Sequence, residues 1–265
     1  MWRKCKQAYA FASEVKIMPK PTDSQFRQLS PMEKGTLGHS FFETYLKDGP
    51  QAMATRAINE ASASSMQVAE LVNNFFLFNQ RLVTNWNRER MFVEAPMMLH
   101  LDAYFDFYAT PDLVVFNEKT EQWEIYDHKF TQNVWDQELA DMSPQLPRYI
   151  HVAEQLYDLD VRRASYIFYR TRAIKDPTQK VMLMETKISS NRMRHAIEDV
   201  RQAADEIMTT EARPMSLSSH GCKFCSFAPL CKAKVEGKRD DYMMIKAADY
   251  TANTYGYGEV HEVQV

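Results

Sequence analysis

Two neighbouring stretches, Asp112-Leu-Val-Val-Phe116 and Trp123-Glu-Ile-Tyr-Asp-His-Lys129, decide the fold of this protein. Both are rich in β-branched and aromatic residues, which is typical of strands, and the polar loop between them suits a hairpin. Pairing the end of the first stretch with the start of the second sets the facing pairs as Phe116–Trp123, Val114–Ile125 and Asp112–Asp127. Alternation puts all six on one face, so the apolar pairs belong to a core and two carboxylates meet at its far end.

The two facing carboxylates are the first indication of chemistry. Directly opposed side chains lie ~5 Å apart at Cβ, and like charges there destabilise a hairpin. A divalent cation between Asp112 and Asp127 would remove that penalty, and Lys129 projects from the same face. Oxygen ligands suit Mg²⁺ or Mn²⁺, the metal lowers the pKa of its bound water, and a lysine can stabilise transition-state charge. The alternative interpretation is that Asp112 caps a turn while Asp127 and Lys129 form a surface ion pair.

The rest of the chain predicts helices around these strands. Helices are expected at 35–46, 59–90, 144–157 and 191–209, and further strands at 91–101, 104–109, 164–171 and 180–187. The pattern indicates an α/β protein with a central mixed sheet flanked by helices. The expected divisions are an N-terminal segment at 1–34, a core at 35–210 with a helical insertion at 59–90, a cysteine-rich segment at 211–240 and a loose polar tail at 241–265.

Composition places limits on function. The 265 residues include 32 Lys and Arg against 35 Asp and Glu, so the net charge is −3 and the protein is no generic polycation. Any contact with nucleic acid must therefore come from a local basic face. The sequence contains no apolar run near the ~18 residues of a membrane helix and no signal-peptide core. We therefore expect an intracellular, cytoplasmic protein without a membrane partner, whose thiols stay reduced.

The cysteines are clustered. Cys222-x-x-Cys225-x₅-Cys231 places three of the four thiols within ten residues, and Cys5 could supply a fourth ligand. Four thiolates suit either a tetrahedral zinc or an iron–sulfur cluster. His220 is a candidate substitute ligand, which keeps zinc open. The alternative is a set of buried cysteines that bind nothing.

Two further pairs share helix faces. His39 and Glu43 stand four residues apart, so Glu43 could orient the imidazole, and Gln145 and Tyr149 have the same spacing on a later helix. Each pair alone is compatible with an ordinary structural role.

Together these residues resemble the PD-(D/E)XK nucleases of the RecB type. The shared motifs, in the same order, are Gly35-Thr-Leu-Gly-His39, Pro111-Asp112 with Asp127-His-Lys129, and Gln145-Leu-Pro-Arg-Tyr149. The resemblance implies a restriction-endonuclease-like core. It also implies that the metal ligands are His39, Asp112, Asp127 and the backbone carbonyl of His128. Lys129 would be catalytic, and Gln145 and Tyr149 would contact the DNA backbone or support the site. Thr110 departs from the glycine that many members carry two residues before the first aspartate.

The cysteine layout is similar to the iron–sulfur branch of these nucleases, which includes AddB-type subunits and CRISPR-associated RecB-type exonucleases. That similarity implies a [4Fe-4S] cluster on Cys5, Cys222, Cys225 and Cys231, with structural Zn²⁺ as the alternative. The cluster would hold the C-terminal segment against a short helix that is expected within residues 1–19.

The resemblance implies a Mg²⁺- or Mn²⁺-dependent DNA exonuclease that acts on single strands or duplex ends in DNA repair or recombination. The sequence contains no G-x-x-x-x-G-K-S/T loop, so a motor, recombinase or integrase would have to be a separate partner. The alternative is a non-catalytic, cluster- or zinc-stapled DNA-binding or assembly subunit of a DNA recombination or processing complex.

Overall fold

The computed structural model describes residues 5–19, 29–82, 85–101, 105–172, 174–211, 222 and 225–252. The chain divides into two compact units. The first, called here the core unit, is Ser24–Glu198. The second, called the terminal unit, combines Met1–Asp23 with Asp199–Val265, so both ends of the chain contribute to it.

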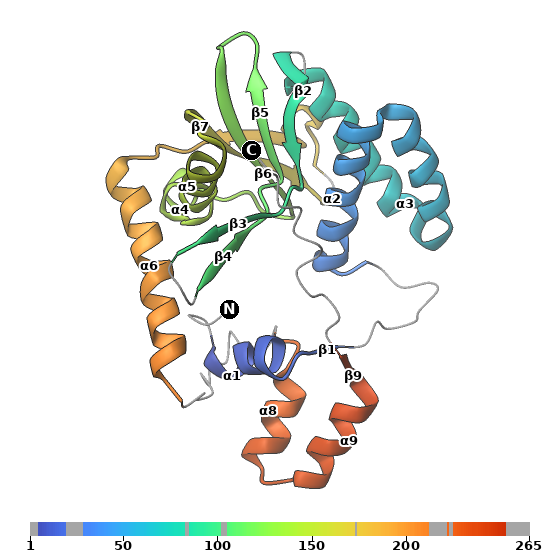
Figure 1. Ribbon diagram of the computed structural model, residues 1–265. Helices are drawn as coiled ribbons and strands as arrows, with labels where there is room; N and C mark the ends of the chain where they lie inside the picture. The colour runs from blue at the N-terminus through green and yellow to red at the C-terminus, as the bar shows by residue number, and fades with distance from the viewer. Residues whose placement is uncertain are drawn as a thin grey trace. The chain divides into compact units, whose positions relative to one another are not determined.

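The core unit is organised around a five-stranded sheet in the order β2-β5-β6-β7-β8 (Figure 1). Its strands are β2 (Trp86–Val93), β5 (Leu113–Asn117), β6 (Gln122–Thr131), β7 (Val161–Arg170) and β8 (Val181–Glu185). β6 and β7 run parallel and the other neighbours are antiparallel. The predicted α/β architecture with a central mixed sheet is confirmed.

The β5–β6 hairpin has the register that alternation predicts. Phe116 faces Trp123 and Val114 faces Ile125. Val114 and Ile125 lie in one apolar cluster with buried residues of α5 (Gln145–Tyr157) and with Ala140 of α4 (Gln137–Met142). Leu113 and Val115, which point to the other face of β5, lie in a second apolar cluster with α2 (Pro31–Asp48) and α3 (Pro50–Leu82). Figure 1 shows these two pairs of helices on opposite faces of the sheet.

Helix α2, which carries His39, is well specified by its own sequence. Ser30 and Glu33 form a reciprocal capping box, and Pro31 occupies the first turn, where its missing N–H is not needed. The helix ends at Asp48 and is followed by the capping residue Gly49, whose φ of 90° lies in the left-handed region. Gly38 allows a close approach to the sheet, because an added Cβ would lie 2.4 Å from a ring carbon of Phe130 on β6.

The predicted helical insertion at 59–90 is wrong at both ends. Helix α3 begins at Pro50 and ends at Leu82, and β2 begins at Trp86. The residues at 86–90 include Asn, Arg and Glu, which do not favour a strand on their own. Here β2 pairs with β5, with a register shift between Trp86 and Met91. Sheet pairing therefore overrides local propensity in this stretch.

The remaining elements of the core unit extend from this framework. β3 (Met97–His100) and β4 (Asp106–Ala109) form a separate antiparallel pair, and a short 3₁₀ turn (Pro177–Gln179) precedes β8. Helix α6 (Ser190–Thr209) follows β8, and its residues from Asp199 onward belong to the terminal unit. None of the helices described here combines the length and apolar character that a membrane crossing requires.

The terminal unit joins the two ends of the chain. Its elements are α1 (Lys6–Tyr9), a π-helical turn (Ala10–Glu14), β1 (Ile17–Pro19), α8 (Ala228–Val235), α9 (Arg239–Asp249) and β9 (Tyr250–Ala252). β1 and β9 pair antiparallel. The prediction of a loose tail at 241–265 is therefore wrong up to residue 252, because this segment contains most of a helix and a paired strand. The rest of that predicted tail, 253–265, lies outside the described residues.

Candidate active site

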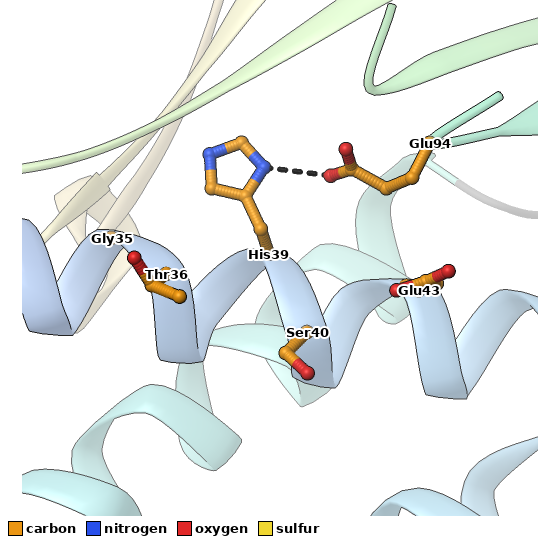
Figure 2. A pocket seen from close by; sticks show the side chains of 6 residues that line it. All are labelled: Gly35, Thr36, His39, Ser40, Glu43 and Glu94. Atoms are coloured by element: carbon orange, nitrogen blue, oxygen red, sulfur yellow. Dashed lines mark hydrogen bonds and ion pairs between the residues drawn. The ribbon is translucent and has the colours of Figure 1, made fainter. Parts of the chain in front are cut away.

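An imidazole and two carboxylates meet where α2 passes the ends of β2 and β5. The Nδ1 atom of His39 lies 2.8 Å from Oε1 of Glu94 and 3.6 Å from Oδ1 of Asp112. One ligand atom from each residue lies within 4.8 Å of the other two, which is an arrangement that could hold a metal ion. Figure 2 shows His39 pointing from α2 toward Glu94.

His39 and Glu94 border an open pocket of about 570 Å³. Its lining consists of Gly35, Thr36, His39, Ser40, Glu43 and Glu94 (Figure 2). All but Glu94 lie on α2, so the helix forms one wall and the residue after β2 forms the other.

Asp112 is held at the start of β5 by the backbone of the neighbouring strand. The backbone N–H of His128 donates to its Oδ2 at 2.5 Å, and only 6% of the residue is exposed. Burial and the charge of Asp127 raise the pKa of Asp112 well above its usual range, against the opposing influence of His39. The carboxylate is therefore costly to ionise in the metal-free protein, and a nearby cation would lower that cost.

The pKa of His39 has opposing causes. Burial alone would lower it, but the hydrogen bond with Glu94 and the negative charge of Asp112 outweigh burial and raise it. A protonated imidazole can thus provide the positive charge that this acidic group needs.

Glu94 is the site residue that sequence reasoning missed. It follows β2 directly and has a φ of 47°, a left-handed conformation that is unfavourable for a residue with a side chain. Its backbone N–H donates to the carbonyl of Asp112 at 3.0 Å, which fixes this turn beside β5. The only sequence signal is an acidic residue at the end of a strand in Val93-Glu-Ala-Pro96. Glu43, which was expected to orient His39, instead accepts a hydrogen bond from Lys47 at 2.8 Å.

A second group of polar residues lies next to the first. The Nζ atom of Lys129 is 2.5 Å from Oδ2 of Asp127 and donates to Oε1 of Gln145 at 2.8 Å. The amide nitrogen of Gln145 donates to Oδ1 of Asp127 at 2.7 Å and to the hydroxyl of Tyr149 at 2.9 Å. Four of the residues predicted from the sequence are therefore brought together, and Gln145 links the other three.

The charge of Asp127 in this second group affects the pKa values of His39 and Asp112 in the first group. Burial raises the pKa of Asp127, while the ammonium of Lys129 acts in the opposite direction. The charge of Asp127 contributes to raising the pKa of both Asp112 and His39, so the two groups form one electrostatic unit. Burial and Asp127 also raise the pKa of Tyr149, which keeps its phenol neutral.

The imidazole of His128 is turned away from these carboxylates into the aromatic cluster beneath α2. It is 1% exposed, its ring centroid is 3.6 Å from that of Phe42, and its Nδ1 lies 3.1 Å from the hydroxyl of Tyr169. Burial lowers its pKa well below the usual range, so the ring stays neutral. The role predicted for its backbone carbonyl as a metal ligand stays a prediction.

The predicted cysteine ligands gather in the terminal unit. Cys5, Cys225 and Cys231 pack against one apolar cluster, and no disulfide joins any of the four cysteines. Burial and the charges of the other three thiols, including Cys222, raise the pKa of Cys231 to about 11. Within the part of the chain that the structure describes, no three of these sulfurs lie within 4.8 Å of one another. His220 lies outside that part.

An α/β core with buried carboxylates, an imidazole and a paired lysine at one end of its sheet has the groups of a metal-dependent phosphodiesterase. The sequence model of the PD-(D/E)XK nuclease superfamily matches residues 2–232, and the chain belongs to this superfamily. Among solved structures, 12 chains match. One of them, titled "Crystal structure of SSO0001", is 10% identical with a TM-score of 0.35, and the match covers 86% of this chain and 94% of that chain. No curated protein matches.

Proposed function

We propose that this protein is a Mg²⁺- or Mn²⁺-dependent DNA nuclease of the RecB-like type, an exonuclease that acts on single strands or duplex ends. Membership of the nuclease superfamily supports hydrolysis of phosphodiester bonds. The observation that carries the proposal is the juxtaposition of two groups, one of His39, Glu94 and Asp112 and the other of Asp127, Lys129 and Gln145. The resemblance to RecB-type nucleases supports DNA as the substrate.

The donor set fits a hard divalent cation. His39, Glu94 and Asp112 offer two carboxylates and an imidazole, and such cations prefer oxygen ligands. When bound, the ion polarises the phosphate and lowers the pKa of a coordinated water. Both oxygens of Asp127 already contact Lys129 or Gln145, which favours Glu94 as the third side-chain ligand. The resemblance adds Asp127 and the carbonyl of His128 to this set.

The lysine is placed to act on charge that develops at the phosphate. Its side chain is 23% exposed, so the ammonium can reach a substrate while Asp127 and Gln145 hold it. A fixed ammonium stabilises negative charge without reorganisation at the moment of reaction. Gln145 restrains both partners of the ion pair at once, and the neutral hydroxyl of Tyr149 restrains Gln145.

A nuclease assay on end-labelled linear single strands, duplexes and circular single strands tests the proposal. We expect the wild type to degrade linear DNA with Mn²⁺ or Mg²⁺ and to be inactive with EDTA. Lys129→Ala should lower kcat by roughly 10²–10³, the range seen when one electrostatic stabiliser is removed. Lys119→Ala provides a matched control, because Lys119 lies in the hairpin turn at the opposite end of β6.

The outcomes separate the proposal from its alternative. If the wild type leaves DNA intact with every metal but still binds it, the non-catalytic DNA-binding or assembly subunit is the correct interpretation. Cleavage of circular as well as linear strands would support a nuclease activity but reject the exonuclease mode of action, because a circle has no end.

We also propose that Cys5, Cys222, Cys225 and Cys231 bind a [4Fe-4S] cluster, with zinc as the alternative. The packing of Cys5, Cys225 and Cys231 against one apolar cluster supports this proposal, because it brings thiols from both ends of the chain together, as a shared metal site requires. Iron, acid-labile sulfide and zinc analysis of anaerobically purified protein tests this. One equivalent of zinc without sulfide would reject the cluster.

A further inference from the structure

Lys129 is bordered by two aromatic rings in addition to its polar partners. Its Nζ lies 5.7 Å from the ring centroid of Trp135 and 5.5 Å from that of Tyr166. Both distances are within the ~6 Å at which a ring face attracts a cation. The rings also contact each other, with centroids 5.1 Å apart and planes at 64°. Two polar and two aromatic groups therefore define where the ammonium lies.

The two rings have contacts in the core unit besides those with Lys129. Tyr166 is fully buried on β7, where it is the register partner of Asp127. Trp135 packs against Phe168, the next residue of β7 on that face, with centroids 5.6 Å apart. The residue after Trp135, Asp136, caps α4 by accepting a hydrogen bond from the N–H of Leu139 at 2.8 Å. Both rings are thus fixed independently of Lys129.

Tyr166 reaches the site in a second way through its hydroxyl. The hydroxyl donates to Oγ of Ser143 at 2.7 Å, two residues before Gln145 at the start of α5. Burial raises the pKa of Tyr166 to about 12, so the phenol keeps its proton for this bond. One side chain therefore contacts Lys129 with its ring and restrains the segment that carries Gln145 with its oxygen.

We propose that Trp135 and Tyr166 are positioning residues of the nuclease: they hold the Lys129 ammonium and Gln145 in the arrangement that acts on the phosphate. The proposal rests on the proposed function for its catalytic consequence. Its structural part, the confinement of Lys129, is independent of activity and can be measured by itself.

Trp135→Leu tests the ring. We expect kcat to fall about tenfold with KM for DNA within about twofold, since a displaced catalytic group affects turnover more than binding. Trp135→Phe retains an aromatic face and should keep kcat within about threefold. Trp123→Leu is the matched control, because Trp123 lies at the other end of β6, where it packs near Arg90 rather than Lys129. It should lose stability without this change in kcat.

Lysine acetylation followed by mass spectrometry supplies the readout that does not need activity. Relative to the exposed Lys47, labelling of Lys129 should rise about fivefold in Trp135→Leu and stay unchanged in Trp123→Leu, because only the former removes a cation–π partner. Equal labelling of Lys129 in the wild type and Trp135→Leu would overturn the proposal. If even the wild type cuts no DNA, the proposed function fails while labelling still decides whether the rings confine the lysine.

A double-mutant cycle tests the hydrogen bond from the hydroxyl of Tyr166 to Ser143. Tyr166→Phe keeps the ring, so Lys129 labelling should not change, but kcat should fall because Ser143 is released. Ser143→Ala should have the same effect, and the double variant should be no worse than either single one. Fully additive losses would show that the two residues act separately and would reject the role of this hydrogen bond.

Discussion

Gly38 on α2 is the position where one added methyl group should affect both stability and the site. In Gly38→Ala the new Cβ would lie 2.4 Å from Cζ and 2.5 Å from Cε1 of Phe130. The Phe130 ring stacks on the buried Tyr169, with centroids 4.6 Å apart and planes at 10°, and its centroid is 5.5 Å from that of His39. The ring cannot move without disturbing Tyr169, His39 or both.

Two effects of opposite sign determine how much Gly38→Ala changes the free energy of unfolding. Replacing Gly by Ala in a helix interior stabilises by about 1 kcal/mol, whereas an overpacked methyl group costs about 1–3 kcal/mol. Gly35→Ala on the same helix is the matched control, because nothing lies within 4 Å of its added Cβ. The two variants should therefore differ by about 1–3 kcal/mol, with Gly38→Ala the less stable. At ~2–4 °C per kcal/mol for a chain of this size, the melting temperatures should differ by about 2–12 °C.

Thermal unfolding of both variants measures the difference in stability, and the DNA cleavage assay measures the effect on the site. Gly35→Ala should melt at or above the wild-type temperature, while Gly38→Ala should melt below Gly35→Ala and lose activity through displacement of His39. If both variants gain the same stability, the close approach of α2 to Phe130 is wrong. If Gly38→Ala loses stability but keeps full activity, the link between Phe130 and His39 is wrong.

Further predictions concern the metal ligands and the thiols. Because the pKa of Asp112 is raised, the folded state binds its proton more tightly than the unfolded state, so stability falls as the pH rises above the ordinary carboxyl pKa of ~3.9. Metal-free Asp112→Asn should therefore melt higher than the wild type at pH 7 but not near pH 3, and Mn²⁺ should raise only the wild-type melting temperature. Glu94→Gln should weaken Mn²⁺ binding by roughly 10–100-fold in calorimetry, whereas Glu43→Gln should leave it within about twofold. Cys231→Ala should lower the melting temperature and abolish bound iron or zinc, and Cys5→Ala should do the same; unchanged melting of either variant would contradict a structural cluster.

The β5–β6 hairpin shows what local pattern can predict. Alternation of apolar residues has a period of two, so a shift of one residue would turn every buried side chain outward. The facing pairs Phe116–Trp123 and Val114–Ile125 follow from this constraint and are confirmed. Lys129 contacts Asp127 because residues two apart on a strand point to the same face. Gln145 and Tyr149 contact each other because residues four apart on a helix share a face.

Other features depend on contacts between distant segments. The segment at 239–252 has no strong apolar pattern, and its order comes with the pairing of β9 with β1 and with the packing of Tyr250 against Phe227. The early end of α3 is likewise decided by the pairing of β2 with β5. In each case the stabilising partner lies far along the chain, beyond the reach of helical or strand periodicity.

The sequence by itself determined the mixed α/β core, the register of its central hairpin and the contact of Lys129 with Asp127. Each of these depends on short-range spacing or on residue chemistry, whereas the choice of His39 came from the resemblance to the nuclease motifs. Only the tertiary structure placed Glu94 beside His39 and Asp112. Its side-chain direction comes from a left-handed backbone turn that is held by a hydrogen bond to the carbonyl of Asp112, just before β5, and no local pattern encodes that turn.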